Sequence, residues 1–158
     1  NYLHQVGFST TEIGFLWSVG VVAEIIMFAF AHVFLTRFSW RYLVSLCLVL
    51  TGIRWMIVGL LPNSFMAQFL AQTIHAFSFG LFHMIAMRVV FQNFSIGQQG
   101  RGQAMYSTMW GLGVALGSIL AGRYWQLISG EVIFIIAGFA TFIGLLFVRW
   151  LPKHIQQA

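Results

Sequence analysis

Five long apolar runs dominate this 158-residue sequence and limit what it can fold into. A helix needs about 20 apolar residues to cross the hydrocarbon core of a bilayer. The runs reach that length, with short polar breaks between them, over residues 13–35, 42–61, 65–90, 103–122 and 132–151. They do not alternate apolar and polar residues as the strands of a membrane barrel do. The sequence therefore predicts an all-α membrane protein, a bundle of five transmembrane helices.

The composition excludes most soluble and catalytic classes. Only 7% of the residues are charged, whereas a soluble domain carries about 25%. The absence of Asp excludes Ser-His-Asp triads and EF-hand loops, and the single Cys47 excludes an internal disulfide or a cysteine zinc cluster. His75 and His83 lie about 12 Å apart along a helix, too far to share a metal. We expect no enzyme activity, no cofactor and no metal site.

The positive charges are distributed as in a membrane protein. The net charge is +5, but the arginines stand singly between apolar runs, so no nucleic acid partner is expected. Lys and Arg concentrate in cytoplasmic loops of membrane proteins. One side of the five runs carries Arg37, Arg41, Arg88, Arg101, Arg149 and Lys153, and the other carries only Arg123. This bias predicts a cytoplasmic carboxyl terminus, an amino terminus outside, and membrane lipid around the helices.

Three ionisable residues stand inside the apolar runs at similar depths. Glu24 is near the centre of the first run, Arg54 is about 10 Å from the outer end of the second, and His75 is about 15 Å from the outer end of the third. A charge at mid-membrane costs a few kcal/mol and usually marks a pathway. We expect Glu24, Arg54 and His75 to converge. The alternative is a static Glu24–Arg54 ion pair that only locks two helices together.

The third run carries a polar stripe. At 100° per residue, Gln68, Gln72, His75 and His83 fall within an arc of roughly 80°. Such a stripe must face protein or water rather than lipid. Aromatic residues beside the stripe suit an apolar or aromatic ligand, and the pocket-lining candidates on all helices are Trp17, Gln72, Phe79, Phe82, His83, Tyr106 and Trp110. The alternative is that these polar groups only join neighbouring helices.

Several segments resemble the carboxyl-terminal half of a major facilitator superfamily transporter, specifically the 3-phenylpropionate permease group. The runs IGFLWSVGVVAE at 13–24 and HAFSFGLFH at 75–83 carry most of the similarity, and 86–88 and 103–107 extend it. The resemblance implies that the five runs are helices eight to twelve of a twelve-helix carrier in a bacterial inner membrane. Residues 1–10 would remain from the preceding helix and outer loop, 11–151 would form the bundle, and 152–158 would be a cytoplasmic tail.

A more distant similarity to the lactose permease branch suggests roles for the ionisable residues. There a membrane Glu, an Arg on the next helix and a His on the one after form the substrate and proton site, and Glu24, Arg54 and His75 stand at matching places. Arg37 and Arg41 match the basic cytoplasmic loop motif, although its usual Asp and Gly are absent.

The sequence also departs from the lactose pattern. Ser78 replaces a second Glu, and Tyr106 and Trp110 stand where a Lys is usual. Without that second acid and that Lys, Arg54 and the histidines are free to balance a carboxylate substrate.

These observations predict part of a proton-coupled symporter for a small aromatic carboxylate such as 3-phenylpropionate. Glu24 is the expected proton-responsive acid, Arg54 its partner or the carboxylate clamp, and His75 the coupling hydrogen-bond donor. The expected partners are the substrate, protons and the missing amino-terminal half of the transporter. Two alternatives stay open: an exporter of drugs or metabolites on the same fold, and a membrane subunit that packs helices without transporting.

Overall fold

The computed structural model describes residues 2–151, and within that range it contains helices and turns but no strand. Five helical stretches are long and apolar enough to cross a membrane: Thr10–Arg37, Trp40–Leu60, Phe65–Asn93, Ile96–Tyr124 and Gly130–Val148. The predicted all-α class and the five spans are confirmed. The expected tail at 152–158 lies outside the described residues.

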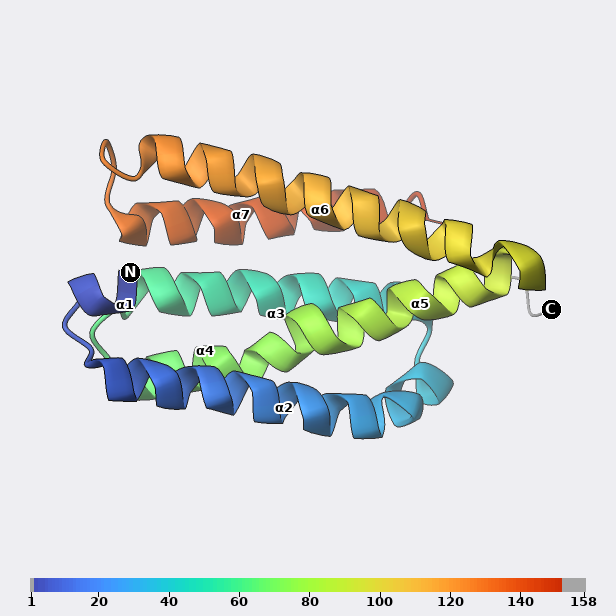
Figure 1. Ribbon diagram of the computed structural model, residues 1–158, viewed down its shortest axis with the longest axis horizontal. Coiled ribbons are helices and arrows are strands. Elements are labelled where there is room, and N and C mark those ends of the chain that lie inside the picture. Colours follow the sequence, from blue (N-terminus) through green and yellow to red (C-terminus); the bar gives the residue numbers. More distant parts are fainter. Residues whose placement is uncertain (1, 152–158) are drawn as a thin grey trace.

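The helices run back and forth along one long axis (Figure 1). The first three elements are a short helix and two spans: α1 (Tyr2–Gln5), α2 (Thr10–Arg37) and α3 (Trp40–Leu60). The third span is divided into α4 (Phe65–His75), a π-helix η1 (Ala76–Leu81) and α5 (Phe82–Asn93). The short 3-10 turn η2 (Ile96–Gln98) leads into α6 (Gln99–Tyr124), and α7 (Gly130–Val148) ends the bundle.

Serine caps set the starts of three spans. The Ser9 side chain accepts a hydrogen bond from the Glu12 backbone N–H while the Glu12 carboxylate accepts one from the Ser9 N–H, so α2 begins at Thr10 rather than residue 13. Ser39 and Ser64 cap α3 and α4 in the same way through their side-chain oxygens. The last helix, α7, ends at Val148 rather than at the predicted residue 151, because a residue that precedes a proline avoids helical geometry.

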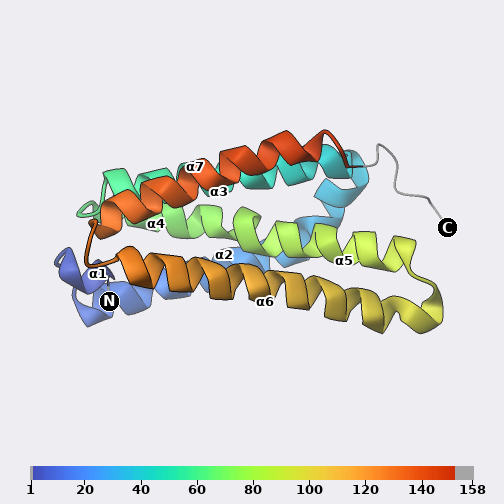
Figure 2. The ribbon, with the colours of Figure 1, turned by 90° about the horizontal axis from the view of Figure 1, so that it is seen from above.

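The packing is uneven across the bundle. Helices α3 and α7 lie side by side along most of their length, which both views show (Figures 1 and 2). Helix α2 packs against α4 and η1, and the buried centre of that part contains Met27, Leu43, Cys47, Leu81 and Ile85. Helix α6 approaches α5 at the end where the chain joins them and then diverges from it (Figure 1), so its most apolar window has no buried residue.

Candidate functional site

A polar cavity of about 210 Å³ lies among α2, α3 and α4. Its lining includes all three ionisable residues that the sequence placed inside the membrane. The wall consists of Trp17, Gly20, Val21 and Glu24 from α2, Arg54 from α3, and Gln72 and His75 from α4. The predicted convergence of Glu24, Arg54 and His75 is therefore present in the structure, together with Trp17 and Gln72 from the predicted lining.

Glu24 is paired with His75 rather than with Arg54. The His75 Nε2 atom lies 2.8 Å from the Glu24 Oε1 atom, and the two side chains are 29% and 18% exposed. Within residues 2–151 this is the only contact at ion-pair distance, and no such contact joins Glu24 to Arg54, so the expected alternative of a Glu24–Arg54 lock is not what the structure shows. The other ring nitrogen of His75, Nδ1, lies 3.5 Å from the Ser78 hydroxyl, which also donates to the His75 carbonyl at 3.0 Å.

Arg54 brings a guanidinium to the same cavity without a direct carboxylate contact among the described residues. Its Nε–H is buried and has no hydrogen-bond partner among the described residues. The guanidinium carbon lies 4.3 Å from the centre of the Trp55 ring, which stabilises the cation from one face only. A buried guanidinium N–H without an acceptor is costly. Because Arg54 also lines the cavity, its guanidinium can bind an anion that enters there.

A close helix contact at Gly20 brings α2 and α4 together at this cavity. A Cβ atom at Gly20 would lie 3.0 Å from the Gln72 Oε1 atom, a separation tighter than ordinary packing. The glycine lets the Gln72 side chain approach the α2 backbone. Sequence reasoning missed Gly20 and Val21 as lining residues, although the position of Gly20 one turn before Glu24 on the same helix face was a usable signal.

Four of the predicted lining residues form an aromatic cluster beside the polar cavity. The Phe79 ring stacks on His75 with centroids 5.7 Å apart and on His83 with centroids 6.2 Å apart. Trp110 from α6 meets Phe79 edge-on at 5.7 Å, and the Tyr106 hydroxyl lies 3.3 Å from the His83 Nδ1 atom. The cluster therefore joins α6 to the third span.

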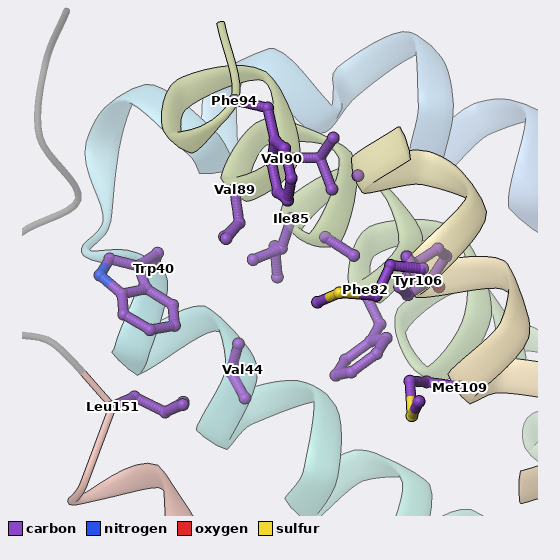
Figure 3. Close-up of a pocket in the computed structure, with 13 residues that line it drawn as sticks. Trp40, Val44, Phe82, Ile85, Val89, Val90, Phe94, Tyr106, Met109 and Leu151 are labelled. Atoms are coloured by element: carbon purple, nitrogen blue, oxygen red, sulfur yellow. The ribbon is translucent and has the colours of Figure 1, made fainter. Parts of the chain in front are cut away.

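Phe82 faces a different part of the molecule from Phe79. It lines an apolar cavity of about 370 Å³ between α3, α5 and α6, shown in Figure 3 with Trp40 and Val44 on one side and Met109 on another. It also borders an open cavity of about 520 Å³ with Tyr106 and Trp110. Neither of these two cavities includes Glu24, Arg54 or His75, so Phe82 does not line the polar cavity.

The two arginines of the predicted loop motif lie at the far end of the bundle from Glu12 and Glu131. Arg41 donates from Nη2 to the carbonyl of Arg149 at 2.8 Å and so caps the end of α7. Arg37 ends α2 and is exposed. Within the part of the chain that the structure describes, no three His, Cys, Asp or Glu side chains are grouped to hold a metal ion.

Comparison with known proteins agrees with this architecture. The family described as the MFS_1 like family matches residues 1–136. A probable 3-phenylpropionic acid transporter of Escherichia coli (strain K12) is 30% identical over 141 residues, which is 86% of this chain and 36% of the relative. The chain thus spans about a third of the length of that relative. No solved structure matches significantly. The family match covers most of the five-helix bundle, and the chain belongs to the MFS_1 like family of the major facilitator superfamily.

Proposed function

We propose that this chain is the carboxyl-terminal part of a secondary active transporter that takes up a small aromatic carboxylate together with protons. The observation that carries the proposal is the cavity that holds a Glu24–His75 pair next to an Arg54 guanidinium with no acceptor. The name of the E. coli relative, a probable 3-phenylpropionic acid transporter, supports the substrate class. Membership of a transporter family supports transport over catalysis.

Arg54 binds the substrate carboxylate in this proposal. Because no carboxylate of the described residues lies at ion-pair distance from Arg54, the guanidinium is free to form charge-assisted hydrogen bonds with an incoming carboxylate. The polar cavity of about 210 Å³ is smaller than a typical pocket for a whole ligand, about 300 Å³ or more. It therefore suits the carboxylate end, while the aromatic ring lies against Phe79, which stacks on His75.

Glu24 and His75 couple the substrate to protons. A carboxyl in a site of low dielectric constant is stable either paired with a cation or protonated, so a proton on Glu24 releases His75 from the pair. His75 is then free to donate to the substrate instead. Substrate binding and protonation thereby favour one another, which is the requirement for symport.

The remaining parts of the proposal concern the whole transporter. Alternating access requires rocking of this bundle against an amino-terminal half around a central site, and the 36% coverage of the relative supports such a half. The excess of arginine at one end supports a cytoplasmic carboxyl terminus and an external amino terminus in a bacterial inner membrane. Membrane lipid would cover the exposed apolar faces of the helices.

The test uses the full-length protein that carries this chain, expressed in de-energised cells. Addition of 3-phenylpropionate to a lightly buffered suspension should make the medium more alkaline than it becomes with cells that lack the transporter. Those cells set the baseline, because the protonated acid crosses the bilayer unaided in both. Glu24→Gln should abolish the excess, whereas the control Glu12→Gln should keep it, since Gln also completes a capping box.

Two results would count against the proposal. If wild-type cells show no excess alkalinisation, either the substrate class or the proton coupling is wrong, and export of other compounds becomes the better explanation. If Glu24→Gln transports with an unchanged proton signal, Glu24 is a packing residue and the coupling assignment fails.

A further inference from the structure

The third span presents three rings in a continuous stack that reaches beyond the polar cavity. His75, Phe79 and His83 lie with interplanar angles of 18° and 11° between successive rings. The first ring belongs to the cavity with Arg54, the second is purely apolar, and the third is polar again. A ligand lying along this face meets a carboxylate-binding group, an aromatic surface and a hydrogen-bonding group in that order.

The π-helix η1 accounts for this alignment. In an α-helix, side chains four residues apart drift by about 40° around the axis, so three such residues would spread over roughly 80°. A π-helix closes its hydrogen bonds over five residues and turns less per residue. Because Ala76–Leu81 adopt that geometry, the drift is reduced and the rings of His75, Phe79 and His83 stack. Single π turns inside α-helices occur frequently at functional sites.

The far end of the stack has hydrogen-bonding capacity that the protein does not use. The His83 Nδ1 atom lies 3.3 Å from the Tyr106 hydroxyl, whereas His83 Nε2 has no hydrogen bond within residues 2–151. Tyr106 is held in turn by ring contacts with His83 at 5.4 Å and with Trp110 at 6.3 Å. One polar pair, built from two helices, thus presents a free ring nitrogen beside an aromatic surface.

We propose that the His83–Tyr106 pair recognises a hydroxyl group on the aromatic ring of the substrate, which makes hydroxyaryl alkanoates the preferred substrate class. This inference rests on the proposed function and on Arg54 as the carboxylate site. A hydroxyl both donates and accepts, so it matches His83 Nε2 in either neutral tautomer. A second carboxylate only accepts hydrogen bonds, so it would match His83 Nε2 only when that nitrogen carries the proton. An alkyl group would leave His83 Nε2 unpaired.

The spacing suits such a ligand. Eight residues separate His75 from His83, about 12 Å along the helix. A ligand that lies alongside this face, and is hydrogen-bonded from the side at each end, can extend over most of that length. A phenyl ring joined to a carboxylate by two methylene groups has that reach when its hydroxyl sits at the meta or para position. The substrate ring then lies along the edge of Phe79, next to Trp110.

The experiment measures competition for uptake of labelled 3-phenylpropionate by the full-length transporter. The competitors are the unlabelled parent acid and its 3-hydroxy and 4-hydroxy ring derivatives. Wild type should bind one hydroxylated acid about three- to tenfold more tightly than the parent, as one added hydrogen bond contributes. Tyr106→Phe and His83→Phe keep the rings but should reduce that preference towards one. Tyr124→Phe, an exposed residue at the other end of α6, should keep the wild-type preference.

Each outcome separates this inference from the proposed function. A wild-type protein that takes up the parent acid but shows no hydroxyl preference overturns the inference alone. A preference that survives in both ring-preserving variants also overturns it, because the hydroxyl is then read elsewhere. A wild-type protein that neither transports nor is inhibited by any of the three acids overturns the proposed function, and the inference falls with it.

Discussion

Gly59 of α3 packs directly against the backbone of α7, and this close approach makes a sharp prediction. A Cβ atom at Gly59 would lie 2.7 Å from the carbonyl oxygen of Glu131 and 2.9 Å from Ile135 Cγ1. The carbonyl belongs to the backbone of the first turn of α7, so it cannot rotate away as a side chain can. Gly59→Ala therefore forces the two helices apart by several tenths of an ångström.

The expected cost follows from two opposing effects. Overpacking a tight contact costs about 1–3 kcal/mol, while Gly→Ala inside a helix gains up to about 1 kcal/mol. Gly144 offers a matched control on the same pair of helices, since its Cβ would lie 3.5 Å from a Leu48 methyl, which is ordinary contact. The helix gain is similar in both variants, so the difference between them reports the steric cost, about 1–3 kcal/mol.

The free energy of unfolding is measured by titrating the purified protein from mild micelles into SDS while following tryptophan fluorescence. Gly144→Ala should be as stable as wild type or slightly more stable, and Gly59→Ala should unfold at a clearly lower SDS fraction. Equal midpoints for the two alanine variants would refute the argument, because they would mean that α3 and α7 do not approach as closely as the structure places them.

Two other predictions concern the ends of the bundle. Arg88 donates to the carbonyl of Leu35 at the end of α2, so Arg88→Met should lower the free energy of unfolding by about 1–2 kcal/mol, whereas the exposed Arg37→Met should change it little in the same SDS titration. Burial and the nearby Glu131 carboxylate raise the pKa of Tyr2 from 10.0 to about 12. The stability that depends on the neutral phenol should be complete below pH 10 and lost as the pH rises towards 12; phenolate absorbance should show this late titration, and Tyr2→Phe should remove it.

The number of spans and the gathering of Glu24, Arg54 and His75 could be predicted because both follow from simple rules. Span length is fixed by bilayer thickness, and ionisable groups inside a membrane must turn towards protein or water. Similar depth on three successive helices then brings the groups together. The pairing within the site could not be predicted in the same way. Whether Glu24 meets His75 or Arg54 depends on helix rotation and on side-chain reach within about an ångström, which sequence depth does not specify.

The separation of Phe79 from Phe82 could not be predicted because uniform helix geometry was assumed. At 100° per residue the two rings stand about 60° apart and share one face. The smaller rotation per residue in η1 turns Phe82 further from Phe79 while it brings His75 and His83 into line. The sequence of η1 contains no Pro that would indicate a change in helix geometry. The π-helix geometry of η1 therefore aligns His75 with His83 and separates Phe82 from Phe79.

The unequal packing of the helices links the site to movement. Arg54 belongs to α3, which packs closely against α7, whereas Tyr106 and Trp110 belong to α6, which meets the rest of the bundle mainly through α5. A ligand can shift a conformational equilibrium only by its difference in affinity for the two states. In the proposed binding mode the substrate is held by Arg54 at one end and by His83 and Tyr106 at the other. Such a substrate would have that difference in affinity whenever α6 moves, because only one arrangement lets both ends bind. Recognition of the ring hydroxyl would therefore shift the conformational equilibrium of the transporter as well as raise affinity.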